Sequence, residues 1–275
     1  MNNSLISVII PTHNNASAIH TAIDSIIRQT YKNLEIIVVD DNSTDDTKEI
    51  IIELAKQDAR VHYYALPEDD PYRIDPVLKH NTNAGYIARN FGFTKAHGEL
   101  ITFQDADDAS LLNRIEVQYR LLTKYNAIHL CTTVAPFDEK RIGTMFDMKN
   151  YALGEKNMIG PDELYLLSQK TKGLIAKLFP TLNARIPFHL KRLRFINKLF
   201  FGSLAPYPGA GNSPLFKREV IEKVKFRKLP NRIWPSFMGR GADRDFNFQV
   251  AETFKNSYTF DIPLYMWSRE QIKKP

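Results

Sequence analysis

The 275-residue sequence predicts an α/β fold, with a mainly parallel sheet flanked by helices and a less regular C-terminal half. Two observations predict it. Short apolar runs alternate with segments of helical periodicity through residues 1–135, and this alternation stops in the rest of the chain. Strands and helices that alternate in this way typically build a parallel sheet with helices on both faces. We therefore expect one continuous domain in two halves, 1–135 and 136–275.

The first half contains five apolar runs rich in β-forming residues. We expect strands at 5–10, 34–39, 61–66, 99–104 and 127–135. After the first run, Ile19, Ala22, Ile23, Ile26 and Ile27 repeat at the spacing of one helix face. Further helices are expected around 50–54, over 85–96 and over 112–122. Ser43 or Thr44 can cap the first of these three helices.

The second half has helix patterns at 161–169 and 243–254, and a Gly/Pro loop at 206–214. The stretch 164–218 contains no Asp or Glu but ten Lys and Arg residues, in a chain whose net charge is +6. Many apolar residues are interleaved with these cations. Such a stretch fits either an anionic membrane surface or a solvated helical hairpin that packs its apolar side on the core.

Composition narrows the class of protein. A hydrophobic content of 43% is enough for a globular core, and the single cysteine, Cys131, excludes an intrachain disulfide. We find no signal peptide and no apolar run of about 20 residues. We expect a cytoplasmic protein, peripheral on the inner face of the cell membrane if the stretch 164–218 binds lipid. Nothing outside that basic stretch supports a nucleic-acid partner.

The segment ELITFQDADDAS places Asp105, Asp107 and Asp108 at the end of an apolar strand. Two carboxylates about 4 Å apart repel by roughly 4 kcal/mol at an effective dielectric near 20, so this cluster does not stabilise the fold. In extended backbone Asp105 and Asp107 share a face and Asp108 points away. The pair can hold a divalent cation, share a proton as an acid/base pair, or form a solvated turn.

Polar clusters also follow two other expected strands. PTHNN comes after the first strand and DDNSTDD after the second. Parallel sheets bind ligands at the carboxyl ends of their strands. Three such clusters together predict a binding site at that edge of the sheet, and they weaken the solvated-turn interpretation of each one.

These segments resemble the ordered signature of family-2 glycosyltransferases. The matching elements are Pro11-Thr12-His13-Asn14, Ser25 to Tyr31, Val38 to Asp45, Asn83-Ala84-Gly85 with Ala88-Arg89-Asn90, and Asp105-Ala106-Asp107-Asp108 followed by Leu112 to Ile115. The resemblance implies a GT-A (Rossmann-like) fold, a nucleotide-sugar donor with UDP favoured, a Mn²⁺ or Mg²⁺ ion and an inverting displacement. It assigns 1–135 to nucleotide-sugar binding and 136–275 to acceptor binding.

The resemblance also implies roles for single residues. It assigns nucleotide-sugar contacts to Pro11, Thr12, Asn14, Asp40, Asp41, Asn83, Arg89 and Asp105. Asp41 would accept the imide N–H of uracil, whereas Asp40 has the alternative of capping backbone N–H groups in its own loop. Arg89 has the alternative of a salt bridge on a helix surface. His13 is expected to be a tolerated aromatic residue rather than a catalyst.

The acid cluster then divides by role. The resemblance makes Asp107 the metal ligand, with Asp105 supporting it at the ribose or sugar, and Asp108 supporting the turn. The metal would offset both the repulsion among the carboxylates and the charge that develops on the departing UDP.

Inversion needs a general base for the acceptor hydroxyl. The segment GADRDF matches the opening of a late helix in the family and points to Asp243, with Asp245 as the fallback. The match is incomplete, because Ala242 stands in place of the motif's first acid and Gln249 stands near the expected Arg. Asp243 has the alternative of capping its helix.

We therefore expect an inverting hexosyl- or N-acetylhexosaminyl-transferase that acts on a glycan or lipid-linked acceptor, in polysaccharide or lipopolysaccharide synthesis. A catalytically inactive nucleotide- or sugar-binding relative and a sugar nucleotidyltransferase are the alternatives. The nucleotidyltransferase should have a Gly-rich loop after strand one, and PTHNN has no glycine. Residues 68–76 are an insertion beyond the usual spacing, which forms a lid, an acceptor-side loop or plain solvated surface. Trp234 either stacks on a sugar or is buried.

Overall fold

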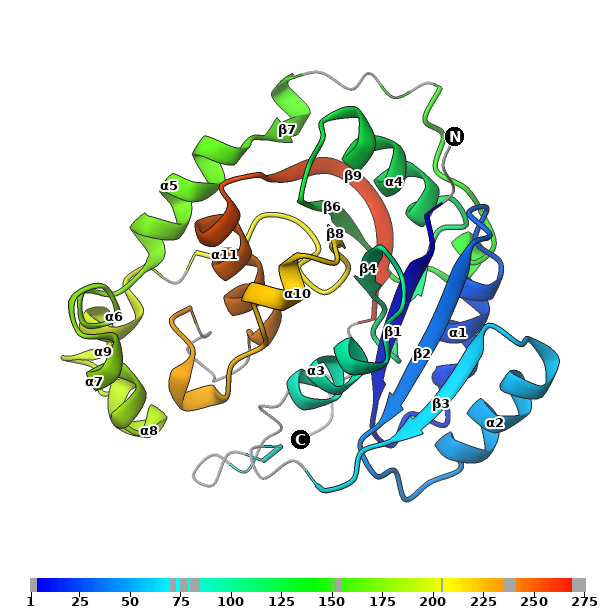
Figure 1. Cartoon of the computed structure of the whole chain (residues 1–275), viewed down its shortest axis with the longest axis horizontal. Helices are drawn as coiled ribbons and strands as arrows, with labels where there is room; N and C mark the ends of the chain where they lie inside the picture. The colour runs from blue at the N-terminus through cyan, green and yellow to red at the C-terminus, as the bar shows by residue number, and fades with distance from the viewer. Residues whose placement is uncertain are drawn as a thin grey trace.

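The computed structural model describes residues 4–69, 73–74, 79, 85–149, 151, 155–203, 205–234 and 241–268. Its centre is one mixed sheet in the strand order β3-β2-β1-β4-β8-β6-β9-β5, and β7 pairs with β9. Figure 1 shows this sheet crossing the molecule, with helices on both sides of it. The predicted α/β class with a mainly parallel sheet is therefore confirmed.

The parallel part of the sheet is made by the first four strands. They are β1 (Ile6–Thr12), β2 (Leu34–Asp40), β3 (Val61–Ala65) and β4 (Leu100–Phe103). β1 pairs in parallel with β2 and β4, and β2 pairs with β3. Every residue of β1 and β2 is buried, which explains why these strands are continuous apolar runs in the sequence.

Successive side chains of β1 enter two different cores because a strand alternates its faces. Val8 and Ile10 pack in the core that includes residues of α1, α2 and α4. Ile9 packs on the other face with residues of α3, α10 and α11. The helix bounds are α1 (Ile19–Ile27), α2 (Thr47–Gln57), α3 (Tyr86–Lys95), α4 (Arg114–Lys124), α10 (Val220–Lys223) and α11 (Ala242–Phe254).

One expected helix start is wrong. Neither Ser43 nor Thr44 caps α2, which begins at Thr47. The carboxylate of Asp45 instead accepts a hydrogen bond from the Thr47 backbone N–H at 3.1 Å. The hydroxyl of Ser43 is directed back toward the end of β2, as described below.

Four strands of the sheet were not expected from the sequence. They are β5 (Ala109–Ser110), β7 (Met158–Ile159), β8 (Leu215–Lys217) and β9 (Ser257–Trp267). The first three have only two or three residues, which is too few to show the alternation of apolar and polar residues that identifies a strand. β9 contains Pro263, which weakens a strand pattern, and the structure accommodates it at a register shift opposite Thr133 of β6 (His129–Pro136). Because β6 and β9 pair, the sheet runs through both halves of the chain.

Of the two alternatives for the basic stretch, the helical hairpin is wrong. After α5 (Pro161–Thr171), the chain forms four short helices, α6 (Leu174–Leu178), α7 (Pro180–Arg185), α8 (Phe188–Lys191) and α9 (Asn197–Phe201). α6 ends two residues before Pro180 and α7 ends two residues before Pro187. Proline breaks a helix at an interior position because it has no backbone N–H and its ring clashes with the preceding turn. Figure 1 shows α6–α9 gathered at the edge of the molecule far from β1–β3.

The connections also contain the 3-10 helices η1 (Glu139–Arg141), η2 (Glu155–Asn157) and η3 (Leu229–Asn231). Across the described ranges, no helix has both the length and the apolar character that crossing a bilayer requires.

Candidate active site

The carboxyl ends of β1, β2 and β4 border a cavity of about 560 Å³. The start of α3, the loop 206–212, the start of α11 and the end of β9 form its other walls. The expected site residues that line it are Pro11, Thr12, Asp41, Arg89, Asp105, Asp107 and Asp243. Asn14, Asp40 and Asp245 are described but do not line it, and Asn83 lies outside the described residues.

Asp105, Asp107 and Asp108 each offer a carboxylate oxygen, and these oxygens lie within 4.8 Å of one another. The expectation that Asp108 points away is wrong, because residues 105–108 form a turn in which the Asp108 N–H donates to Asp105 O at 3.3 Å. Asp108 also supports the turn, since its Oδ1 accepts from the Ser268 N–H at 2.7 Å.

Burial and the proximity of the three carboxyl groups make it unfavourable for all of them to be ionised, although Arg89 forms an ion pair with Asp105. Burial, followed by the charges of Asp105 and Asp107, raises the pKa of Asp108 to about 9. Three converging carboxylate oxygens are the ligand set that Mg²⁺ and Mn²⁺ accept. The residues present therefore fit a divalent cation, which would relieve their mutual repulsion.

Arg89 is an internal residue, with 3% of its surface exposed. Its guanidinium forms an ion pair with Asp105 Oδ1 and lies 5.5 Å from the ring centres of two phenylalanines. The alternative of a surface salt bridge is thus wrong. On the other side, Asn212 Nδ2 donates to Asp105 Oδ2 at 2.8 Å and to Asp108 Oδ2 at 3.3 Å. Arg89 and Asn212 together fix the orientation of Asp105.

Asp41 is held by Arg73, a residue of the insertion 68–76. Arg73 Nε and Nη2 donate to the two Asp41 carboxylate oxygens at 3.0 and 2.6 Å, and Nη2 also donates to Asp41 O at 3.0 Å. His13 Nδ1 lies 2.6 Å from the same carbonyl oxygen. Because Arg73 lines the cavity, the interpretation of the insertion as plain solvated surface does not hold at this residue.

Asp40 and Asn14 hold the loop that follows β2. Asp40 Oδ1 accepts from the backbone N–H and the hydroxyl of Ser43 at 3.0 and 2.5 Å, and its Oδ2 accepts from the Tyr63 hydroxyl at 3.0 Å. Asn14 Oδ1 accepts from the Thr44 N–H at 2.7 Å. These bonds match the loop-capping alternative for Asp40.

The two acids of α11 have different surroundings. Asp243 lies in the first turn and borders the cavity. It does not cap the helix, because the N-cap is Gly241, at φ +93°, and no side-chain cap bond is present. Asp245 is fully buried, and its Oδ1 accepts from the N–H groups of Ile233 and Trp234 at 2.7 and 3.0 Å. Asp245 therefore orders the backbone behind the helix.

A buried polar pair ties α11 to the loop 206–212. Asn247 Nδ2 donates to Asp243 O and to Gly211 O, both at 2.7 Å, and its Oδ1 lies 2.7 Å from His129 Nε2. Burial lowers the pKa of His129 to about 4, against the opposite effect of the Asn247 hydrogen bond. His129 is therefore neutral at physiological pH, as an uncompensated interior position requires.

Sequence reasoning missed Asn212, Tyr265 and Trp267. The Tyr265 hydroxyl accepts from the Asp105 N–H at 3.0 Å, and Trp267 lines the cavity with 40% of its surface exposed. Trp234 is fully buried, so the expectation of a buried residue is confirmed and sugar stacking by Trp234 is wrong. The sequence YMW at 265–267 could have indicated aromatic site residues, but only if β9 had been predicted, because it is the pairing of β9 that brings them to the site.

A sheet of this kind, with carboxylates collected beyond its strand ends, belongs to the class of open α/β proteins that bind ligands at that edge. The profile described as "Glycosyl transferase family 2" matches residues 7–179, which is more than half of the chain. The chain therefore belongs to glycosyl transferase family 2, and its fold is GT-A.

Curated relatives match about half of the chain or less at the level of sequence. An uncharacterized glycosyltransferase of Rickettsia conorii is 36% identical over 141 residues, covering 51% of this chain and 21% of that protein. The GalNAc(5)-diNAcBac-PP-undecaprenol beta-1,3-glucosyltransferase of Campylobacter jejuni is 42% identical over 106 residues, covering 38% and 30%. In these two alignments the chain spans less than a third of the relative's length.

Solved structures are similar in fold across nearly the whole chain. TarS 1–349 of S. aureus in complex with UDP-GlcNAc has a TM-score of 0.56 at 15% identity, covering 97% of this chain and 59% of that one. The mannosyltransferase PcManGT of Pyrobaculum calidifontis in complex with GDP-Man and Mn²⁺ has a TM-score of 0.53 at 18% identity, covering 94% and 55%.

Proposed function

We propose that this chain transfers a sugar from a UDP-sugar to a hydroxyl of a glycan or lipid-linked acceptor, with inversion, a divalent metal and Asp243 as the general base. The observation that carries the proposal is the meeting of three acidic groups of different origin at one cavity. Asp41 comes from the end of β2, the cluster 105–108 from the turn after β4, and Asp243 from α11.

The donor half of the proposal rests on the ends of β1 and β2. Asp41 is an acceptor-only group at the cavity wall, suited to the imide N–H of uracil. Pro11 and Thr12 border the same space. The fold likeness to TarS, whose structure holds UDP-GlcNAc, supports UDP as the nucleotide. The loop held by Asp40 and Asn14 would keep Asp41 in place.

The acid cluster would hold the cation, with Asp107 as the preferred ligand and Asp105 supporting it. When bound, a divalent cation would neutralise negative charge on the diphosphate leaving group. Arg89 and Asn212 would keep the Asp105 carboxylate turned toward the cavity. The Mn²⁺ in the structure of PcManGT is consistent with this assignment.

Asp243 is favoured as the base over Asp245. Its side chain borders the same cavity as the acid cluster, whereas both backbone bonds of Asp245 would be lost if that side chain turned to a substrate. A base on the acceptor side removes the hydroxyl proton while the leaving group departs on the other side, which is the geometry of inversion. The exposed ring of Trp267 offers an apolar face on which an acceptor sugar can stack.

The lipid-linked acceptor is the finer part of the proposal. It is supported by the printed name of the Campylobacter jejuni relative, which contains an undecaprenol-linked acceptor. A hexose or N-acetylhexosamine donor and a role in polysaccharide or lipopolysaccharide synthesis fit the same likeness. The loop after β1 lacks glycine, which argues against a sugar nucleotidyltransferase.

The test is UDP release from a panel of UDP-sugars with Mn²⁺, for wild type and for Asp243→Asn. Loss of a general base is expected to slow transfer by about 10²- to 10⁴-fold, while UDP binding in calorimetry stays unchanged. Asp162→Asn is the matched control, because Asp162 also lies in the first turn of a helix but is exposed and does not line the cavity. If wild type binds UDP but turns over no donor, the chain is an inactive nucleotide-binding relative and the proposal fails.

A further inference from the structure

The four short helices α6–α9 expose large apolar side chains to solvent. Eight of the fourteen exposed large hydrophobic residues of the described chain fall between 174 and 199. They are Leu174, Leu178, Phe179, Leu182, Leu190, Leu193, Phe195 and Leu199. Phe195 is 94% exposed, which leaves almost the whole ring in water. A concentration of large exposed apolar side chains on one group of helices indicates an interaction site more often than a free surface.

The same helices are positively charged. Lys177, Arg185, Arg194 and Lys198 are exposed, and they form no ion pair with a carboxylate anywhere in the described ranges. No Asp or Glu occurs in the stretch 164–218. The acids of α5, Asp162 and Glu163, lie at its first turn, which is the end away from α6. The surface therefore combines apolar rings with cations and has no anionic residue of its own.

The helices α6–α9 are ordered by contacts behind the exposed side chains. Phe188, Phe200 and Phe201 pack with Leu229 of η3 in a small separate core. Lys191 Nζ donates to Pro230 O at 2.8 Å. The exposed rings are thus presented by a packed support, which is the arrangement expected of a binding surface rather than of an unfolded segment.

We propose that α6–α9 dock on the surface of an anionic bilayer. Cations that flank inserted Leu and Phe side chains match negatively charged headgroups above a hydrocarbon layer. A protein partner would need a face that is acidic, apolar and complementary in shape. An anionic bilayer supplies negative charge and apolar surface, and it needs no complementary shape because its lipids rearrange around the inserted side chains. This docking does not depend on the transfer chemistry proposed above.

The surface is also coupled to the cavity. α9 ends at Phe201, and the chain enters the cavity wall at Pro206. Arg244, which lines the cavity, donates to Ser203 O at 3.0 Å and to Ala205 O at 2.9 Å. Docking through α6–α9 would therefore hold the acceptor side of the cavity close to the headgroup layer.

Vesicle flotation of the purified chain tests the proposal, with vesicles of phosphatidylcholine alone and with one third phosphatidylglycerol. We expect binding to the anionic vesicles and little binding to phosphatidylcholine. Salt at 1 M, where the Debye length falls to about 3 Å, should reverse the binding to anionic vesicles. Each cation near anionic lipid strengthens partitioning about fivefold. The triple variant Lys177→Gln, Arg194→Gln, Lys198→Gln should therefore partition on the order of 100-fold less, and Phe195→Ser about tenfold less.

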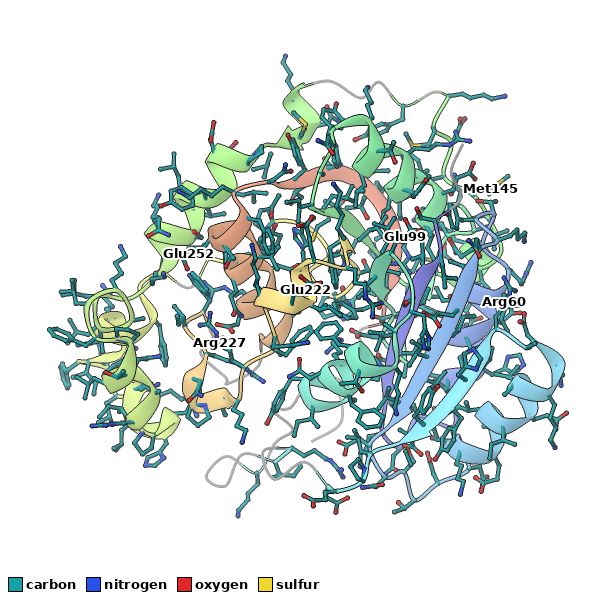
Figure 2. All side chains as sticks on the ribbon, in the orientation of Figure 1. Arg60, Glu99, Met145, Glu222, Arg227 and Glu252 are labelled. Atoms are coloured by element: carbon teal, nitrogen blue, oxygen red, sulfur yellow. The ribbon has the colours of Figure 1, made fainter. Side chains whose placement is uncertain are left out.

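Matched controls separate this surface from general charge and hydrophobicity. Lys32→Gln, Lys48→Gln, Lys124→Gln removes three exposed cations elsewhere, and Met145→Ser removes an exposed apolar side chain on the opposite side of the molecule (Figure 2). Both controls should float like wild type. Circular dichroism and UDP binding on the same preparations show that each variant is folded and that donor binding is intact, so a failure of docking is distinguishable from a failure of the proposed function.

Two results would overturn the proposal. The first is a failure of the flotation pattern, either because wild type stays in the dense fraction with anionic vesicles or because the triple variant floats as well as wild type. The second is a wild-type dimer in light scattering that Phe195→Ser dissociates, with no vesicle binding. That outcome would make α6–α9 an interface between two copies of this chain.

Discussion

Replacing Arg73 by Gln should strengthen UDP binding. In the structure Arg73 occupies both carboxylate oxygens of Asp41, with side-chain exposures of only 17% and 4%. If Asp41 is the acceptor for the uracil imide, Arg73 competes with the base for it. Because Arg73 covers both oxygens of a buried carboxylate, we expect the nucleotide to displace at least one of these bonds when it binds, and Arg73→Gln removes that cost.

The magnitude follows from the type of bond. A hydrogen bond to a charged group is worth about 1.5–3 kcal/mol net, and about 1.4 kcal/mol corresponds to a tenfold change in affinity. Releasing one bond therefore predicts UDP binding that is roughly 10- to 100-fold tighter in Arg73→Gln. Arg73→Lys keeps the charge but loses the two-pronged geometry, so its affinity should be intermediate.

Calorimetric titration with UDP and Mn²⁺ measures the effect. Arg60→Gln is the control, because Arg60 Nε and Nη2 also bind both carboxylate oxygens of one acid, Asp58, at 3.0 and 2.7 Å. Arg60 lies just before β3, away from the strand ends that border the cavity (Figure 2). Its variant should bind UDP like wild type. Weaker binding by Arg73→Gln would refute the reasoning, since Arg73 would then contact the nucleotide itself.

Two further predictions concern the metal and the buried histidine. Asp107→Asn should weaken Mn²⁺ binding in the presence of UDP by at least the 10- to 100-fold typical of outer-shell partners; unchanged Mn²⁺ affinity in titration would transfer the ligand role to Asp105 and Asp108. The pKa of His129 falls from 6.5 to about 4 on folding, so the unfolded chain takes up the proton first. The contribution of His129 to the free energy of unfolding is therefore fully present above about pH 6.5, and it falls by about 3 kcal/mol as the pH is lowered toward 4. Urea unfolding of wild type and His129→Gln should show this slope in wild type alone, and equal slopes would contradict it.

The first half of the fold was accessible from sequence because its signals are local. Each buried strand there is a continuous apolar run, and each helix carries a clear apolar face, so the five expected strands match within two residues at either end. β5, β7 and β8 owe their existence to neighbours distant in sequence. β8, for example, pairs with β4 through Thr102 and Leu215, and nothing in its three residues identifies it as a strand.

The candidate site divides in the same way. Asp41, Asp105 and Asp107 could be predicted as cavity residues because each belongs to a short acidic motif directly after an apolar strand. The rotation of Asp108 toward its neighbours was missed, because a turn replaces the extended backbone on which the alternation rule depends. Asn212 and Tyr265 reach Asp105 from 107 and 160 residues away, and such pairings have no local pattern.

The position of β9 near the end of the sequence affects the order in which the parts of the site can form during synthesis. Tyr265 can contact Asp105, and Trp267 can line the cavity, only when residues 257–267 have left the ribosome and paired with β6 and β5. The strands β1–β4 emerge first, so they can pair while the turn 105–108 still lacks its contact with Tyr265 and the Ser268 backbone. A nascent chain would therefore have its four parallel strands available before it could complete the contacts of its acidic cluster, and before Phe260, Ile262 and Leu264 could complete the core beneath them.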